Sequence, residues 1–569
     1  MLREVVYVAL SVSLFVSIGV AGAAFTVRAW RARPWIGVGL GLLATALCGL
    51  VVFYAFILGT IAGAAVTGLI LGSSVWGLFR FPWRPYWRSL LQGAALFSCG
   101  VAIYLSLGTL WRFPGDLAVQ LQNRFFALPI DNQLPTLFVQ HVLQGNFGQL
   151  MVGDWHSSDR PPLQTGLILL VEILSHPSLI WAHSPSNLMA ADVSTVGQIV
   201  GLVSQCFWIV GLYCLLSALD FRKKSITLAL VGCFVTPVVL VNSLFVWPKM
   251  LAASLMLIAY ALAIHLVKEP RSIRTLLPFA FIAATLSVLS HGGAAFALPG
   301  LLIPAWLIFR SLRKSPPGRW LIWFLAGVGA SLVLYLPWTL YQKLLDPPGD
   351  RLLKWHFAGV IPVNESVSFF QALLAQYNHM DFATWATGRV ANLDTILGWS
   401  AFGSWISHPT VESAKTLDFY SLLFSCLLGL VLIVLALLAA RRGANTFDLV
   451  NSRLVLLGTA VSVLVWACVM FIPGSTLVHQ GTLIWCVVVG GLGYAMATER
   501  FPRLVVFAIA IQTLYSVVVY SKPSGNASAS LNLAAVALGA CALLASLWLV
   551  KSTASEVKGS RIIYMNSQD

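Results

Sequence analysis

Apolar runs of about 20 residues, separated by short basic loops, follow one another along almost the whole chain. A run of that length is what an α-helix needs to cross the hydrocarbon core of a bilayer. Only 10% of the 569 residues are charged, whereas soluble domains carry about 25%. The runs therefore predict an all-α polytopic membrane protein with about 13 to 16 transmembrane helices.

The basic residues gather in alternate loops, and such loops stay in the cytoplasm. On this rule the N-terminus lies outside and the C-terminus inside, with about fifteen crossings. Two long polar segments then lie outside: the first polar segment, 111–163, and the second polar segment, 341–416. The formal net charge of +15 is thus a topology signal and does not indicate nucleic-acid binding.

The order of the runs predicts four regions. Additional transmembrane helices at 1–88 come first, followed by a transmembrane core at 89–340 that contains the first polar segment. The second polar segment, with an interfacial helix near 366–377, then leads to C-terminal transmembrane helices at 417–569. Within the core, 226–245 is expected to be one crossing. Residues 164–178 are too few for a full crossing, so we expect a short or re-entrant helix there with Glu172 facing protein.

Two aspartates of the first polar segment are candidate catalytic residues. Asp131 lies between two prolines, where a carboxylate can act as general base toward a hydroxyl or amine, or can cap the helix that follows. Asp159 begins the run Asp159-Arg160-Pro161-Pro162, where the chain returns to the membrane. Arg160 is suited to grip a phosphate, and the alternative is an Asp–Arg surface pair that closes the loop.

Further candidate substrate-binding residues are basic side chains at predicted span ends. Lys249 follows Trp247-Pro248, and a lysine there either anchors the helix at the interface or binds an anion. His291 precedes two glycines, which permit close approach to a substrate, although a simple hairpin turn would explain the same pattern. The second polar segment adds a cluster suited to a phosphate or to anionic headgroups: Arg351, Lys354 and His356.

Metal binding is left open by the sequence. Asp154, His156 and Asp159 could together hold a divalent cation, but no spacing requires it. The nine cysteines are scattered and form no CxxC or Cys/His cluster, so neither a disulfide framework nor a zinc site is predicted.

Several of these motifs together resemble the GT-C superfamily of membrane glycosyltransferases, in particular the bacterial relatives of protein O-mannosyltransferases and aminoarabinose transferases. The resemblance covers mainly 89–310. Asp131 matches an early acid of the first outer loop, Gly145 a following glycine, and Arg160-Pro161-Pro162-Leu163 the closing motif, while Trp247-Pro248-Lys249 is similar to a recurrent feature. Asn132 departs from the pattern because many members have Glu there, so Asp154 or Asp159 would supply a second acid.

The resemblance implies a GT-C-like helical bundle that binds a polyprenyl-phosphate-linked sugar donor in a cavity open to the outer leaflet. Asp131 would deprotonate a glycan, lipid or protein acceptor, which attacks the anomeric carbon with inversion. Arg160, Lys249 and the cluster at 351–356 would stabilise the leaving phosphate. The expected location is the inner (plasma) membrane, with the active site facing outside.

Three other functions fit parts of the pattern. An O-antigen ligase or polymerase would place its key residues in the second polar segment and make Asp131 dispensable. A flippase or transporter would carry charges along its spans, and these spans are nearly free of charge apart from Glu172. An envelope assembly protein would tolerate substitutions in the first polar segment.

Overall fold

Helices make up nearly all of the fold. The structure, a computed structural model, describes residues 2–26, 33–80, 83–112, 130–148, 150–180, 190–313, 318–360, 366–440, 447–471, 483–520 and 530–545. Within these ranges 10 helices are long and apolar enough to cross a membrane, or up to 11 if one bent pair is a single span. The chain is therefore an all-α polytopic membrane protein, as predicted.

Every predicted span coincides with an apolar helix, a bent pair of helices or a shorter apolar helix of the described residues. The exception to the predicted geometry is 226–245, which is not one straight helix. It is divided into α11 (Lys223–Phe234) and α12 (Pro237–Ser243), whose axes are bent by 72°. The break has a local cause: a residue before proline disfavours the helical conformation, and Thr236 is extended.

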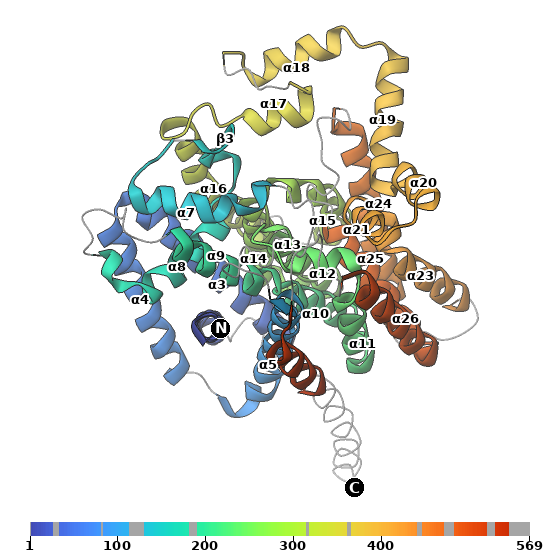
Figure 1. Cartoon of the computed structure of the whole chain (residues 1–569), viewed down its shortest axis with the longest axis horizontal. Helices are drawn as coiled ribbons and strands as arrows, with labels where there is room; N and C mark the ends of the chain where they lie inside the picture. Colours follow the sequence, from blue (N-terminus) through green and yellow to red (C-terminus); the bar gives the residue numbers. More distant parts are fainter. Residues whose placement is uncertain are drawn as a thin grey trace.

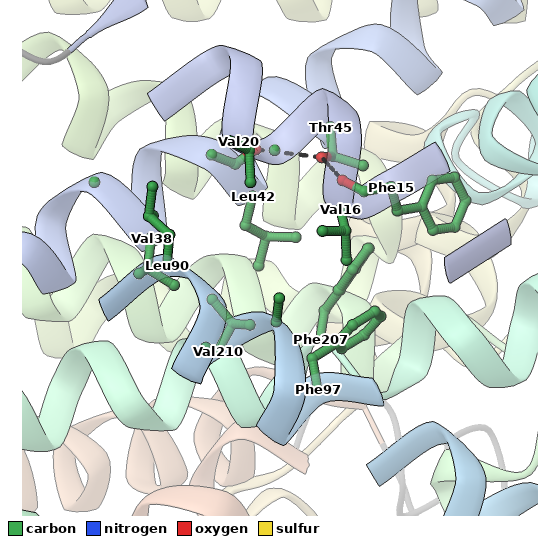
Figure 2. A pocket seen from close by; sticks show the side chains of 15 residues that line it. Phe15, Val16, Val20, Val38, Leu42, Thr45, Leu90, Phe97, Phe207 and Val210 are labelled. Carbon is green, nitrogen blue, oxygen red and sulfur yellow. Dashed lines mark hydrogen bonds between the residues drawn. The ribbon is translucent and has the colours of Figure 1, made fainter. Parts of the chain in front are cut away.

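The N-terminal helices pack through small residues. They are α1 (Leu2–Phe25), α3 (Pro34–Leu58), α4 (Thr60–Arg80) and α5 (Trp83–Gly108). A Cβ on Gly41 of α3 would overlap the carbonyl oxygen of Gly19 in α1, so the two helices approach closely there. Beside this contact lies an apolar pocket of about 70 Å³ whose one polar side chain, Thr45, is hydrogen-bonded to the carbonyls of Phe15 and Gly41 (Figure 2).

The predicted short helix at 164–178 is α8 (Leu163–Ser175), which is followed by η3 (Pro177–Ile180). Glu172 is fully buried and lies 2.9 Å from Nδ1 of His176, so it faces protein as predicted. A Cβ on Gly166 would overlap the carbonyl oxygen of Gly49, which shows how tightly α8 packs against α3.

One helix lies at the centre of the bundle. This helix, α13 (Lys249–Lys268), is 94% buried over its most apolar window, whereas α16 (Gly318–Leu344) is only 6% buried and faces outward. The remaining core elements are α9 (Ala190–Gln205), α10 (Trp208–Ala218), η5 (Pro270–Ser272), α14 (Ile273–Ser290), η6 (Gly292–Ala297) and α15 (Leu298–Leu312).

The two polar segments fold into short elements; β3, α17 and α18 lie toward the top of Figure 1, whereas α7, α20 and α21 lie lower in the same view. The first contains β1 (Trp111–Arg112), η1 (Ile130–Gln133), α7 (Leu134–Gln144), β2 (Leu150–Val152), β3 (Trp155–His156) and η2 (Ser157–Asp159). The second contains α17 (Arg351–Ala358), α18 (Phe369–Asn378), α19 (Phe382–Leu397), α20 (Trp399–Ser407) and α21 (Val411–Tyr420). The expected interfacial helix near 366–377 corresponds to α18, which exposes Phe370 and Leu374 one turn apart.

The C-terminal part completes the bundle with α22 (Leu422–Ser425), α23 (Leu427–Ala440), α24 (Leu449–Val469), α25 (Leu483–Thr498), α26 (Pro502–Tyr520) and β4 (Ser530–Leu531). The described residues contain only two small antiparallel sheets, β1 with β4 and β2 with β3. The first of these joins the chain after α5 to the chain after α26.

Candidate active site

The β2–β3 hairpin delivers Asp159 into the protein. Gly153 forms the turn with a positive φ of 56°, and η2 follows β3 directly. The backbone N–H of His156 donates to Oδ2 of Asp159 over 2.8 Å, which fixes the carboxylate relative to the hairpin. Pro161 and Pro162 then lead into α8.

Asp159 and Arg160 are buried, with 5% and 6% of their surfaces exposed, so they do not form a surface pair. Nη1 of Arg160 donates to the backbone oxygen of Asp159, and its guanidinium carbon lies 4.6 Å from the ring centroid of Trp155. The Arg160 side chain is thereby held between its own loop and an aromatic face.

The Asp159 carboxyl is unusually hard to ionise. Burial raises its pKa from the ordinary 3.8 to about 6, because a charged carboxylate is poorly solvated there. The hydrogen bond from His156 and the charges of Arg351 and Arg160 oppose that rise only in part. Nε of Arg351 lies 3.7 Å from Asp159 Oδ2. A carboxyl with this pKa can gain and lose a proton near neutral pH.

Asp346 joins the two polar segments, and sequence reasoning missed it. Its buried carboxylate accepts a hydrogen bond from the Ser158 backbone N–H over 2.5 Å, and Oδ1 lies 2.8 Å from Nδ1 of His156. Nε2 of Gln342 adds a hydrogen bond to the Ser158 carbonyl oxygen. The loop that carries Asp159 is therefore held by the second polar segment.

Lys249 lies at the first residue of α13 and is 2% exposed. Its Nζ is 3.3 Å from the ring centroid of Trp247, a cation–π contact. The backbone N–H groups of Met250 and Leu251 donate to Oε1 of Gln205. Gln205 therefore satisfies two of the backbone donors at the start of α13, next to the Lys249 side chain.

His291 lies between α14 and η6. Its Nδ1 accepts a hydrogen bond from the Gly293 backbone N–H over 3.2 Å, so the neutral ring carries its proton on Nε2. Burial and the nearby charges of Lys249, Arg160 and His356 hold the pKa of His291 well below its usual range. The structure thus brings four predicted residues together from separate parts of the chain: Arg160, Lys249, His291 and His356.

A cavity of about 440 Å³ lies at this meeting point. Its polar wall contains Asp159, Arg160, His291 and His356, and a small cavity beside it is lined by Lys249 and again by His291. The remaining wall is largely apolar and aromatic, and includes Trp155, Trp247, Val288, Phe296, Pro299, Tyr335, Trp338, Trp355, Val465 and Val469. The lining of the cavity therefore combines charged side chains with apolar and aromatic ones.

The predicted cluster on α17 is divided between two faces of that helix. His356 lines the cavity, whereas Arg351 and Lys354 do not. Nη2 of Arg351 donates to the Asp154 backbone oxygen over 2.6 Å, and Nζ of Lys354 lies 2.8 Å from Oδ1 of Asp350. These two cations therefore face acidic groups instead of the cavity.

Asp131 belongs to η1, but its side chain lies outside the described residues. The N-cap position of α7 is Gln133, which makes no side-chain capping bond, and a capping role for Asp131 stays a prediction. The adjacent Asn132 is described: it is 2% exposed, and its Oδ1 accepts a hydrogen bond from the Trp247 backbone N–H over 3.3 Å.

The three candidate metal ligands do not form one site. Asp154 lies beside Arg351, His156 is paired with Asp346, and Asp159 accepts from the His156 backbone. Throughout the part of the chain that the structure describes, no three His, Cys, Asp or Glu side chains are grouped so that they could hold a metal ion.

Comparison with known proteins gives two solved structures. No protein-family model matches the chain, and no curated protein matches it. ArnT from Cupriavidus metallidurans bound to undecaprenyl phosphate is similar over 72% of this chain and 77% of that chain, with 12% identity and a TM-score of 0.32. The apo state of the same protein matches over 69% and 75%, with 14% identity and a TM-score of 0.30. Both structures are of ArnT, an aminoarabinose transferase, and this is the group that the motifs resemble.

Proposed function

We propose that this protein is a membrane glycosyltransferase that moves a sugar from a polyprenyl-phosphate-linked donor to a lipid, glycan or protein acceptor. The observation that carries the proposal is one cavity whose lining combines a buried carboxyl of raised pKa, Asp159, with the guanidinium of Arg160 and the imidazoles of His291 and His356. A sugar-phosphate transferase needs both a base for the acceptor and positive charge for the departing phosphate.

The lining of the cavity suits both parts of such a donor. The basic side chains accept a phosphate, and the apolar side chains accept the start of an isoprenoid chain. Part of that apolar lining comes from Tyr335 on α16, a helix that faces outward along nearly its whole length, and from Val465 and Val469 on α24. An amphiphile can thus keep its tail beside lipid while its headgroup lies near Asp159.

The reaction follows from these positions. The acceptor hydroxyl loses its proton to the Asp159 carboxylate while its oxygen bonds to the anomeric carbon. The bond between that carbon and the phosphate oxygen breaks, and its electron pair leaves with the lipid phosphate. Arg160, Lys249, His291 and His356 stabilise the charge that develops there. Attack opposite to the leaving group inverts the anomeric centre of the transferred hexose or pentose.

Asp131 is a second candidate base, because its backbone is adjacent to Asn132, which is bonded to the cavity residue Trp247. We place the site on the outward face of the inner membrane, because the positive-inside rule puts both polar segments there.

The test is transfer of labelled sugar from a panel of polyprenyl-phosphate sugars in membranes that contain wild type, Asp159→Asn or Asp131→Asn. Loss of transfer in Asp159→Asn with retained donor binding supports Asp159 as the base, and the same result for Asp131→Asn alone moves that role to Asp131. Transfer that needs His356 but neither aspartate points to a ligase or polymerase instead. No transfer from any donor by wild type overturns the proposal.

A further inference from the structure

Asn132 connects the Asp131 segment to the turn that carries Trp247 and Lys249. Its Oδ1 accepts a hydrogen bond from the Trp247 backbone N–H, and 98% of the residue's surface is buried. An N–H group can only donate, so this bond fixes which end of the Asn132 amide faces the turn. The bond spans 115 positions of sequence.

The surroundings of this bond leave the turn little freedom. A Cβ on Gly201 of α9 would lie 2.7 Å from the Cα of Val246, and a Cβ on Gly197 would lie 2.5 Å from Oγ1 of Thr136 in α7. Nε2 of Gln198 donates to the Leu244 carbonyl oxygen over 2.8 Å. α7 and the turn at 244–247 are therefore both packed directly against α9, with Asn132 across the junction.

We infer that Asn132 is a positioning residue for the phosphate-binding cations. Its hydrogen bond to the Trp247 backbone fixes the position of the Trp247 ring, against which the Lys249 ammonium group packs. The ring of Trp247 lines the main cavity, and Lys249 Nζ lies 3.3 Å from its centroid. If the Trp247 backbone shifts, the ring and the ammonium group shift with it. The role in phosphate binding rests on the proposed function, whereas the placement of Lys249 does not.

The inference gives a physical reason for an amide at position 132. A carboxylate at this buried point would offer the same acceptor oxygen but would add a negative charge close to the cations. An amide provides the acceptor and leaves the local charge positive. Asn132→Asp therefore keeps the hydrogen bond, and Asn132→Leu removes it at similar volume.

The first readout is independent of function: the rate at which a small amine-reactive reagent labels Lys249 in the membrane-embedded protein, measured by peptide mass spectrometry. We expect labelling to rise at least about fivefold in Asn132→Leu and not to rise in Asn132→Asp, whose added negative charge favours the protonated, unreactive ammonium of Lys249. The matched control is Asn392→Leu, because Asn392 is also buried and its amide donates to two backbone groups, the Ala467 and Met470 carbonyls, in another part of the chain. Unchanged labelling in Asn132→Leu, or an equal rise in Asn392→Leu, overturns the inference.

The second readout is undecaprenyl phosphate affinity, measured by native mass spectrometry for Asn132→Leu, Lys249→Met and the double variant. We expect each single change to weaken binding about tenfold and the double variant to be no weaker than Lys249→Met, because Asn132 acts through Lys249. If the loss of affinity in the double variant equals the product of the losses in the two single variants, the two residues act independently and the inference is overturned. If wild type shows protected Lys249 but binds no polyprenyl phosphate, the placement stands and the proposed function fails. Asn132→Ala replaces Asn132→Leu if the larger side chain prevents folding.

Discussion

Nε of Arg351 lies 3.7 Å from Oδ2 of Asp159, an ion pair between the second polar segment and the end of the first. Both residues are buried, and the same guanidinium also donates to the Asp154 backbone oxygen. Arg351 thus stabilises the candidate base and the hairpin that carries it. The pair shows that neither polar segment forms the site alone.

Replacing Asp159 by Asn should lower the transfer rate about 100-fold or more, because the amide cannot accept the acceptor's proton. In wild type the base must be ionised, so activity should rise with pH and reach half its maximum near the Asp159 pKa of about 6. The pH series of transfer rates checks this, and the residual activity of Asp159→Asn should lack that step. A wild-type profile that stays flat between pH 5 and 8 would contradict the assignment.

The same raised pKa has an opposite consequence for stability. The unfolded chain loses the Asp159 proton near 3.8, whereas the folded protein keeps it up to about 6. Since the folded state binds more protons in that window, the free energy of unfolding contributed by this group falls as pH rises from about 4 to 6. The difference in thermal midpoint, wild type minus Asp159→Asn, should become smaller as pH rises over that range. A difference that grows with pH would contradict the raised pKa of Asp159.

Removing the charge of Arg351 should move the activity profile toward higher pH. Arg351 lowers the pKa of Asp159, so Arg351→Leu should raise the pH at half-maximal activity above the wild-type value. Arg351→Lys keeps a positive charge and serves as the control, with a smaller displacement. An unmoved midpoint in Arg351→Leu, in protein that retains its thermal stability, would show that Asp159 does not control the profile.

Lys249→Met should weaken undecaprenyl phosphate binding about tenfold, because it removes a buried charge beside the cavity but keeps a long apolar side chain over Trp247. Lys343→Met is the matched control, since Lys343 is an exposed lysine near the end of α16. Binding measured by native mass spectrometry should separate the two variants. Equal effects would mean that general surface charge, and not the cavity, attracts the lipid.

Hydropathy predicted the helices well because the bilayer demands long apolar runs, and this demand is visible in any window of sequence. The broken span was signalled by Pro237 but was hidden by the apolar residues on both sides. The run at 159–163 identified two residues of the cavity wall because paired prolines mark a fixed point of the chain.

Sequence could not show which charges face one another. Arg351 and Lys354 are three residues apart and share one face of α17, whereas His356 lines the cavity. The three residues of the predicted cluster therefore do not form one binding site. Asp346 and Asn132 were missed as structural residues because their partners lie 188 and 115 positions away. A single polar residue in a loop carries no periodic signal of such a distant partner.

His291 should contribute equally to lipid-phosphate binding at all pH values above about 6. Its pKa lies well below the usual range, so the imidazole stays neutral there and donates from Nε2. His291→Phe should reduce affinity, and His291→Gln, which keeps an N–H donor, should restore part of it. The ratio of wild-type to His291→Phe affinity should be constant from pH 6.5 to 8.5, and a ratio that grows toward low pH would indicate a protonated histidine.

Asp346→Ala should be the most damaging of these changes to the stability of the polar segments. It would leave the buried Ser158 N–H and the His156 ring without their carboxylate, at a cost of about 2–3 kcal/mol, since both bonds involve a charged group. Asp154→Ala is the control in the same hairpin, because the Asp154 side chain is 78% exposed and its pair with Arg351 is worth less than about 1 kcal/mol. Thermal unfolding of both variants should show a clear fall in the midpoint for Asp346→Ala only, together with faster proteolysis between 145 and 160. Because the same loop positions Asp159, activity should fall with it, and Asp346→Ala with normal stability but no transfer would instead assign Asp346 a direct part in the reaction.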